Sequence, residues 1–418
     1  MKILIIGSGG REHAIAWKFA QNSKVEKIYV APGNAGTELL DICENIELFN
    51  IEEMVEFAEN NKIGLTMVGS EELLVEGIVD KFEERGLTIF GPNKKSAILE
   101  GSKAYSKNFM KKYGVKTAAY EIFSDYDNAI KYLDTIEYPT VIKASGLAAG
   151  KGVIIAQNKE EALEAVKEML LDNKFKQTSA RIVIEEFLIG AEASILSITD
   201  GETIIPFISA KDHKKIGEGE TGLNTGGMGV IAPNPYVTSD IMKDFIDDIM
   251  VPTLEGLKSE KMKFNGVIFF GLMITEKGIY SLEYNMRLGD PETQAVLPLM
   301  ENDFLEILEM CIDGDLDKVK MSWKNSSACC VVGVSGGYPE SYNKGYEITG
   351  ISGVNDLVFI AGAKLEKEKL LTSGGRVINI VSLEKNLETA CKKAYNSIDK
   401  INFEGLFYRR DIGKLYNI

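Results

Sequence analysis

Short apolar segments alternate with helical stretches along the first 102 residues, and this alternation constrains the fold more than any other feature of the chain. The apolar segments predict strands at residues 3–6, 27–30, 65–68 and 88–90. The segments between them predict helices at residues 12–22, 51–59 and 74–84. A β–α–β rhythm produces a parallel sheet that helices cover on both faces. We therefore predict an N-terminal parallel α/β domain over residues 1–102.

The rest of the chain indicates two further units, so we expect a multidomain protein that combines the α/β and α+β classes. A central domain is predicted over residues 103–325. It includes a small α+β lid at about 115–190, a long helix near 239–258 and a β-hairpin that turns at 276–278. Beyond residue 325 the short strands predict a small, mostly β C-terminal domain over 326–418.

Composition excludes several classes of protein. The formal net charge of −15 argues against a nucleic-acid-binding surface, which is usually basic. No apolar run approaches the length that crosses a bilayer, and the first residues lack the pattern of a signal peptide. We therefore expect no membrane partner and a cytoplasmic location. The five cysteines show no metal-binding spacing, and with only two histidines, His13 and His213, an imidazole zinc site is not expected.

The predicted hairpin carries side chains that suit a magnesium–nucleotide site. Its second strand ends with Glu283 and Asn285, and Arg287 follows. Magnesium prefers oxygen ligands and usually keeps substrate phosphates in its shell, while the arginine fork binds phosphate oxygens. Because side chains alternate along a strand, the two polar residues should share one face. The opposite face should hold Tyr280, Leu282 and Tyr284. A surface salt bridge between Glu283 and Arg287 is the alternative.

Glycine-bearing loops at residues 7–12, 33–37 and 69–72 follow the first strands and should meet at one edge of the sheet. The first loop opens a helix, whose N-terminus favours phosphate. A dinucleotide fingerprint fails, because Glu12 stands where its third glycine belongs and no acidic residue closes the second strand. A single phosphate is the favoured ligand, and a plain strand-to-helix turn is the alternative.

Two longer loops and one strand end also carry candidate ligands. Residues 143–152 place two lysines among small residues, which suits phosphate; a plain hairpin loop is the alternative. Residues 217–229 contain six glycines, which favours close contact of the main chain with a ligand over a disordered linker. The strand end at 185–192 could meet a nucleotide base and ribose, or be an ordinary acidic terminus. His213 is a candidate ligand, whereas His13 is typical of a helix face.

Taken together, these segments resemble an ATP-grasp ligase, and within that superfamily the glycinamide ribonucleotide synthetase family. The resemblance covers essentially the whole chain. The matching segments are residues 7–13, 31–37, 99–103, 143–153, 184–188, 212–229, 283–294 and 408–413. Residues 224–229 and 283–294 are highly specific to this family within the superfamily.

The resemblance implies a cleft for Mg²⁺ or Mn²⁺ with ATP between the lid and the central sheet. Glu283 and Asn285 would hold the metal, and Arg287 and Lys143 would act in catalysis. The ATP-binding residues that it implies are Lys103, Lys143, Ser145, Gly146, Gly150, Lys151, Gly152, Glu185, Glu186, Leu188 and Glu192. The substrate-binding residues that it implies are Gly9, Gly10, Arg11, Asn34, Gly36, Asp212, His213, Asn224, Thr225, Gly226, Gly227, Met228, Arg287, Asp290, Pro291 and Glu292.

The same resemblance implies a reaction of purine biosynthesis. ATP would drive the ligation of glycine to 5-phosphoribosylamine through a glycyl phosphate, and the enzyme would be a monomer with these small molecules as its partners. Three alternatives stay open on the residues alone. They are another ATP-grasp carboxylate–amine ligase or carboxylase, a nicotinamide oxidoreductase that uses the first domain, and a non-catalytic nucleotide sensor.

Overall fold

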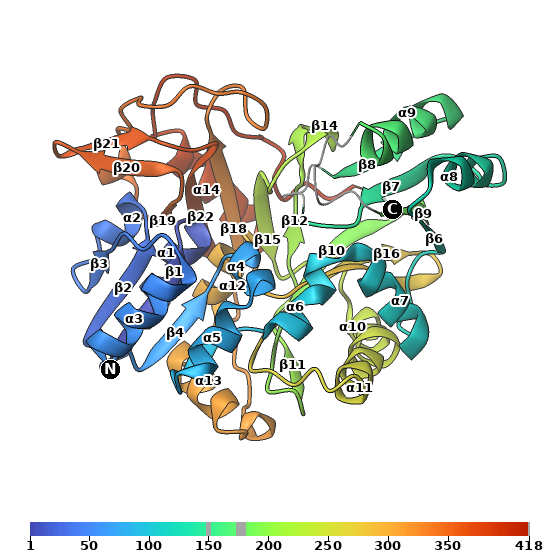
Figure 1. Cartoon of the computed structure of the whole chain (residues 1–418). Helices are drawn as coiled ribbons and strands as arrows, with labels where there is room; N and C mark the ends of the chain where they lie inside the picture. The colour runs from blue at the N-terminus through green and yellow to red at the C-terminus, as the bar shows by residue number, and fades with distance from the viewer. Residues whose placement is uncertain (148–151, 173–180, 417–418) are drawn as a thin grey trace.

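A computed structural model of the chain describes residues 1–147, 152–172 and 181–416. Figure 1 shows the N-terminal sheet (blue) beside the C-terminal strands (orange to red), with the small lid (teal to green) at the other end of the molecule. The sheets are parallel in the N-terminal part and antiparallel elsewhere. The predicted combination of α/β and α+β units is confirmed.

The N-terminal sheet has five parallel strands in the order β3-β2-β1-β4-β5. The strands are β1 (Lys2–Gly7), β2 (Lys27–Pro32), β3 (Cys43–Asn45), β4 (Leu65–Val68) and β5 (Ile89–Phe90). The helices are α1 (Gly10–Phe19), α2 (Ala35–Glu38), α3 (Ile51–Asn61), α4 (Glu71–Glu76), α5 (Ile78–Glu84) and α6 (Lys94–Gly101). Both faces of β1 are buried, because helices cover each side of the sheet.

The predicted single helix over residues 74–84 is wrong. Gly77 has a φ of 102° and separates α4 from α5. A residue in this left-handed conformation ends one helix and cannot continue it. The sequence pattern alone did not distinguish this glycine from one that a helix tolerates.

The lid is an antiparallel sheet in the order β6-β9-β7-β8 with two helices against it. Its elements are β6 (Tyr120–Phe123), α8 (Tyr126–Leu133), β7 (Thr140–Ala144), β8 (Val153–Ala156), α9 (Lys159–Leu170) and β9 (Ile182–Glu186). The lid has a core of its own, in which Leu133 and Val166 from the helices pack against Ile142 and Ile184 from the strands.

A second antiparallel sheet, in the order β11-β10-β16-β17, lies beneath the lid. Its strands are β10 (Ala191–Thr199), β11 (Ile204–Pro206), β16 (Gly266–Thr275) and β17 (Gly278–Asn285). Packed against it are α7 (Lys103–Tyr113), α10 (Ser239–Phe245), the π-helical η2 (Ile246–Met250) and α11 (Val251–Ser259). The predicted long helix is therefore present, with a π-helical middle.

The hairpin β16–β17 is confirmed, but the predicted faces of its side chains are partly wrong. Gly271 pairs with Glu283 and Leu272 with Ser281, so Leu282 is an extra residue in a bulge. One extra residue reverses the alternation of side chains. Ile279 and Tyr284 therefore both lie in the core. The polar residues Glu283 and Asn285 still flank Tyr284 on its opposite side, as predicted.

The third large sheet joins distant parts of the chain in the order β12-β15-β18-β22-β19. Its strands are β12 (Lys211–Asp212), β15 (Gly229–Ala232), β18 (Ser327–Val334), β19 (Leu357–Ile360) and β22 (Arg376–Glu384). Helices α12 (Glu292–Leu299) and α14 (Leu387–Ile398) pack on it, together with α1. The remaining elements are β13 (Lys215–Gly217), β14 (Thr221–Asn224), α13 (Phe304–Ile312), η3 (Leu316–Lys318), η4 (Ile351–Gly353), β20 (Ala363–Glu366) and β21 (Lys369–Thr372).

Within the described parts of the chain, none of the helices combines the length and the apolar character needed to cross a membrane.

Candidate active site

Glu283 and Asn285 lie at the end of β17 within reach of several positive charges. Burial raises the pKa of the Glu283 carboxyl, but the charges of Lys214, Lys143 and Lys103 outweigh it and hold the pKa below its usual value. The carboxylate makes no hydrogen bond or ion pair with the residues that the structure describes. It is therefore an ionised oxygen donor surrounded by cations.

Carboxylates from two helices hold Arg287 beside this group. Its Nε lies 3.4 Å from Glu71 of α4, and its Nη2 lies 3.3 Å from Glu100 of α6. Nη2 also donates to Oδ1 of Asn285 at 3.4 Å. Glu100 accepts a further hydrogen bond of 2.6 Å from the main-chain N–H of Met286. The guanidinium is thus oriented from two sides before any ligand arrives.

Two lysines share one oxygen of Glu185 at the end of β9. The Nζ of Lys143 from β7 and the Nζ of Lys107 from α7 each lie 3.0 Å from Glu185 Oε2. The second oxygen, Oε1, is buried without a hydrogen-bond partner among the described residues. Sequence reasoning identified Lys143 and Glu185 but not Lys107.

The loop after β7 is tied to the first turn of α7. Lys103 donates from Nζ to the carbonyl oxygen of Gly146 at 3.2 Å, and burial lowers the pKa of its ammonium. The hydroxyl of Ser145 accepts a hydrogen bond of 3.1 Å from Ala104 N–H. Gly152 accepts from Ala144 N–H at 2.8 Å, where β8 begins. The predicted residues Gly150 and Lys151 lie outside the described residues.

The other predicted nucleotide residues follow β9 toward β10. Glu186 is exposed, and one of its oxygens lies 3.4 Å from Ala119 N, which donates to it. Leu188 is partly exposed in the following loop. Glu192 forms an ion pair of 3.1 Å with Lys214, a residue that sequence reasoning had not assigned to the site. The nearby charge of Glu192 raises the pKa of Lys214.

A buried pair of carboxyls, Asp212 of β12 and Glu292 of α12, adjoins Lys214. Burial raises the pKa of both, and the charge of Glu292 raises that of Asp212 further. Gly227, in the glycine-rich loop of residues 217–229, lies against this pair. A Cβ there would lie 2.7 Å from Asp212 Oδ1 and 2.5 Å from Pro291 Cδ, and its φ is 117°. Only glycine fits this position, so the loop main chain approaches the carboxyl pair closely.

The loop after β1 meets the segment that follows β17. The main-chain N–H of Arg11 donates to Asp290 Oδ2 at 3.2 Å, and Arg11 Nη1 donates to the Leu288 carbonyl at 3.0 Å. Gly9 lies against the same carboxylate, because a Cβ on it would lie 2.7 Å from Asp290 Oδ2, whereas a Cβ on Gly10 would lie 2.7 Å from Gln294 Nε2. The side chain of Asn34 already has hydrogen-bond partners within the protein, because its amide donates to the carbonyls of Ser8, Gly9 and Ile360. Its side-chain oxygen caps α2 by accepting from Gly36 N–H at 2.7 Å.

The C-terminal region contributes residues that sequence reasoning missed. Arg376 of β22 donates to the carbonyls of Asp290, at 2.6 Å, and of Gly226, and its Nη2 lies 3.2 Å from Asp290 Oδ1. Tyr338 accepts at its hydroxyl from Gly226 N–H at 2.9 Å. Both residues therefore position the glycine-rich loop.

The glycine-rich loop is internally ordered. Thr225 donates to the Lys214 carbonyl at 2.8 Å and accepts from Gly227 N–H at 2.9 Å. Asn224 ends β14 and pairs with Lys215. These contacts are the reason why the segment is not a disordered linker.

Two predicted substrate-binding residues face the interior instead. His213 is fully buried, its Nδ1 lies 3.1 Å from the Gly229 carbonyl, and its Nε2 accepts from Gly413 N–H at 3.3 Å. Burial lowers its pKa to about 3, so the imidazole is neutral. Met228 is also fully buried and packs in the main core. This geometry gives both residues a supporting role rather than a place on the site surface.

The donor set suits magnesium when substrate phosphates complete the coordination shell. Glu283 is ionised, and among the described residues Asn285 Oδ1 receives only the long hydrogen bond from Arg287. Over the described ranges no three Asp, Glu, His or Cys side chains are grouped to hold an ion by themselves. Magnesium is commonly bound through one or two carboxylates and substrate phosphates, so the residues fit that group.

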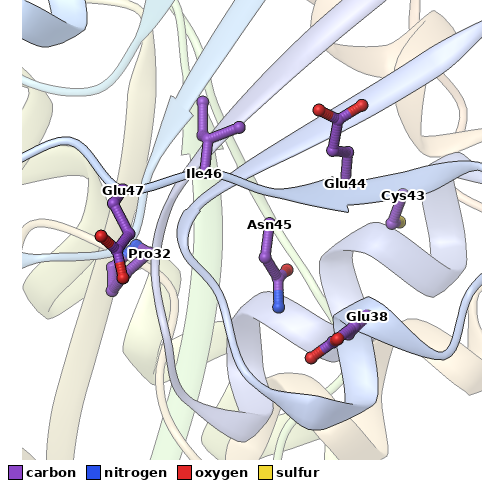
Figure 2. Close-up of a pocket in the computed structure, with 7 residues that line it drawn as sticks. All are labelled: Pro32, Glu38, Cys43, Glu44, Asn45, Ile46 and Glu47. Atoms are coloured by element: carbon purple, nitrogen blue, oxygen red, sulfur yellow. The ribbon is translucent and has the colours of Figure 1, made fainter. Parts of the chain in front are cut away.

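A separate depression of about 400 Å³ lies at the edge of the N-terminal sheet, around β3. Figure 2 shows the carboxylates of Glu38, Glu44 and Glu47 around it. Asn45, which also lines it, donates to the Asn34 carbonyl at 2.8 Å. None of the predicted site residues lines this depression.

The central region defines the chain as a protein of the ATP-grasp class. Residues 101–293 match the sequence profile of the "Phosphoribosylglycinamide synthetase, ATP-grasp (A) domain". Residues 1–100 match the N domain of the same family, and residues 328–415 match its C domain. The chain therefore belongs to the phosphoribosylglycinamide synthetase family, which confirms the family resemblance of the sequence.

Relatives and solved structures agree with this assignment. The phosphoribosylamine–glycine ligase of Fusobacterium nucleatum is 59% identical, covering 100% of this chain and 99% of the relative. That of Clostridium acetobutylicum is 55% identical, covering 99% and 100%. The crystal structure of phosphoribosylamine–glycine ligase from Thermotoga maritima is similar with a TM-score of 0.85 at 35% identity, covering 99% of this chain and 100% of that one. Biotin carboxylase from Campylobacter jejuni has a TM-score of 0.76 at 14% identity, covering 99% and 94%, and shares the fold alone.

Proposed function

We propose that this protein joins glycine to 5-phosphoribosylamine while converting ATP to ADP and phosphate. The observation that carries the proposal is the convergence of Lys103, Lys143, Lys214 and Arg287 on the ionised Glu283. A triphosphate with a divalent cation is the polyanion that complements such a set. Similarity to relatives named phosphoribosylamine–glycine ligase supports the choice of the two other substrates.

Catalysis by these residues is positioning and charge neutralisation, because phosphoryl transfer requires no protein nucleophile. Lys143 and Lys103 would neutralise phosphate oxygens from the lid and from α7. Arg287, held by Glu71 and Glu100, would face the charge that develops on the transferring phosphoryl group. Magnesium, held by Glu283 and Asn285, would supply Lewis-acid stabilisation of the phosphate oxygens.

The proposed reaction has two steps. A carboxylate oxygen of glycine attacks the γ-phosphorus of ATP. This displaces ADP and forms glycyl phosphate. The amine nitrogen of phosphoribosylamine then attacks the acyl carbon, loses a proton and expels phosphate. Acyl phosphates hydrolyse readily, so a lid over the site favours transfer to the amine over transfer to water.

Under this proposal the amine substrate lies between the loop after β1 and the glycine-rich loop. Arg11 donates to Asp290, Arg376 joins Asp290 to the Gly226 carbonyl of the glycine-rich loop, and Gly227 allows the main chain to approach. The proposed substrate-binding residues are Gly9, Gly10, Arg11, Thr225, Gly226, Gly227, Arg287, Asp290, Pro291 and Glu292, with Asp212 beside them.

The decisive experiment measures ADP release by the purified protein with each substrate omitted in turn. We expect release that requires ATP, Mg²⁺, glycine and phosphoribosylamine together, and formation of the glycine amide product by mass spectrometry. A matched inactive control is Lys143→Met. Release that depends on bicarbonate in place of glycine would assign the chain to carboxylation, and no release with any acceptor would remove the ligase proposal.

Glu283→Ala tests the proposed metal ligand. We expect turnover to fall by about 10²- to 10³-fold, with a higher Mg²⁺ concentration at half-maximal rate, because the site loses its ionised oxygen. Glu276→Ala is the matched control, since Glu276 is exposed in the turn of the same hairpin. Turnover of Glu283→Ala close to that of the parent at low Mg²⁺ would exclude this assignment.

A cytoplasmic location, a monomeric state and domain boundaries at residues 102 and 325 belong to the proposal as well. The family assignment supports the first two. The family matches that end at residue 100 and begin at residue 328 support boundaries near these positions.

A further inference from the structure

Lys107 is a buried cation of the nucleotide region that the mechanism above does not use. It lies on α7 with 2% of its side chain exposed. Its Nζ lies 3.0 Å from Glu185 Oε2 and donates to the Thr117 hydroxyl at 2.6 Å. The same ammonium lies 5.9 Å from the centre of the Tyr120 ring. A lysine is rarely buried in this way unless its charge is paired.

Glu185 carries more positive charge around it than it can balance. Lys107 and Lys143 share its Oε2 at equal distances, so one carboxylate faces two ammonium groups in the interior. Its other oxygen, Oε1, is buried and lacks a hydrogen-bond partner in the described residues. Surplus positive charge and an unused acceptor both indicate that an anionic ligand with a donor group completes this cluster.

A ligand phosphate that attracts Lys143 must draw it away from Glu185, at least in part. Without another cation, the carboxylate would then be buried and unpaired, and it would compete with the phosphate for Lys143. Lys107 prevents this, because it remains within 3.0 Å of the same oxygen. Burial lowers the pKa of the Lys107 ammonium to about 8, while the charge of Glu185 opposes the shift, so its positive charge depends on this carboxylate.

Lys107 is also connected to the strand that carries the proposed metal ligands. Thr117, which accepts from Lys107, donates to the Ser281 carbonyl at 2.6 Å. Ser281 precedes Glu283 by two positions on β17. The charged groups that face Lys107 are thus Glu185 from β9, Lys143 from β7 and Glu283 from β17, with the Tyr120 ring from β6.

We propose that Lys107 is a positioning residue for nucleotide binding, which keeps Glu185 paired so that Lys143 is released to the phosphates of ATP. This inference rests on the proposed function, since it assumes that the site binds a nucleotide. It adds a third lysine, with an indirect role, to the two that contact phosphate.

The test compares affinity for ADP with Mg²⁺, measured by calorimetry in the absence of glycine and amine. Lys107→Met should raise the Kd by about tenfold or more, because Glu185 then retains Lys143. Lys107→Arg keeps the charge and should stay within about threefold of the parent. Lys111→Met is the matched control, because Lys111 is exposed on the same helix and lies 5.8 Å from the same Tyr120 ring. It should change the Kd by no more than about twofold.

A double variant separates this role from a general loss of structure. In Lys107→Met with Glu185→Gln, no carboxylate competes for Lys143, so the Kd should recover relative to Lys107→Met alone. A purely structural role predicts equal or greater loss in the double variant. Thermal unfolding midpoints of all variants show whether each is folded. If Lys107→Met does not fold, the double variant, compared with Glu185→Gln alone, carries the test, and equal Kd values for these two support the inference.

An unchanged Kd in folded Lys107→Met, or no recovery in the double variant, would overturn the inference. Failure of the proposed function is distinguishable, because it gives a parent protein that binds no ADP or releases none with glycine and the amine. A different ATP-grasp ligase would still show the Lys107 effect on ADP.

Discussion

At the scale of single residues, the two histidines show that a sequence pattern typical of a ligand site can belong to a buried residue. His213 stands in a basic, glycine-flanked segment, yet it is fully buried between Gly229 and Gly413. His13 is 7% exposed and accepts at Nδ1 from Ile360 N–H at 2.9 Å. Burial lowers the pKa of His13 to about 4 and that of His213 to about 3. Both imidazoles are therefore neutral in the folded protein.

We predict that these histidines make the folded state sensitive to mild acid. Their pKa in the unfolded chain is about 6.5, so between pH 6.5 and about 4 the unfolded state binds protons that the folded state does not. Stability is then lost as the pH falls, by about 1.4 kcal/mol per pH unit for each histidine. Buried carboxyls such as Asp212 and Glu100, whose pKa values are raised, act in the opposite direction.

His213→Gln isolates the effect from that of the carboxyls. Urea unfolding at several pH values should show that the parent is more stable than His213→Gln at pH 7. The difference between their free energies of unfolding should narrow by about 1.4 kcal/mol per pH unit below pH 6. A difference independent of pH would mean that folding does not lower the pKa of His213.

Single residues also show which parts of the site a sequence can reveal. Glu283, Asn285 and Arg287 are candidates on sequence alone because they stand close together on one predicted strand and its continuation. Glu100 and Arg376 were missed, because each is one charged residue in an ordinary helix or strand. Glu100 bonds to Met286, which is 186 positions away, and Arg376 bonds to Asp290, which is 86 positions away. Such pairing leaves no local pattern.

At the scale of elements, strong periodicity predicted where helices and strands occur, and local conformation decided how they end. The hairpin, the lid strands β7, β8 and β9, and α14 occur where their apolar patterns predicted them, whereas the lid strand β6 was missed. Short elements such as α2 and β3 were missed, because a few residues carry no periodicity. The bulge at Leu282 was also missed, since an extra residue in one strand is defined only by its partner.

Gly77→Ala tests the break between α4 and α5. Alanine at a φ of 102° is strained, and we expect a loss of about 1–2 kcal/mol in the free energy of unfolding. Crowding adds little, because the nearest atom to a new Cβ is Lys94 Cδ, at 3.3 Å in a flexible side chain. Glu76→Ala, at the exposed neighbouring position, is the control and should change stability by less than about 0.5 kcal/mol. A more stable Gly77→Ala protein would show that one continuous helix is accessible after all.

At the scale of the whole molecule, the C-terminal region completes a sheet that begins elsewhere in the chain. Strand β15 pairs with β18, and β18 pairs with β22. The main core joins Phe19 of α1, Val296 of α12 and Ile380 of β22. Apolar patterns predicted β18 and β22 but neither β15 nor the order of the strands in the sheet, because any of several exposed edges could have paired with them.

We therefore predict that residues 1–325 do not fold alone. Without β18 and β22 the sheet edge at β15 and the apolar faces of α1 and α12 would be exposed, and such surfaces aggregate. Expression of this fragment should give insoluble protein by sedimentation, and co-expression of residues 326–418 should restore a soluble complex. A soluble 1–325 fragment with cooperative urea unfolding would contradict this view.

The sequence by itself determined the classes of fold, the order of most helices and strands, and the identity of the residues on β17, because these depend on local periodicity and on chemistry carried by neighbouring positions. Only the tertiary structure decided that Lys107 and Lys143 share Glu185, that Glu71 and Glu100 orient Arg287, and that β12 and β15 continue into the C-terminal sheet. The reason is physical: burial makes unpaired charges and open strand edges costly, and the partners that satisfy them can come from any part of the chain.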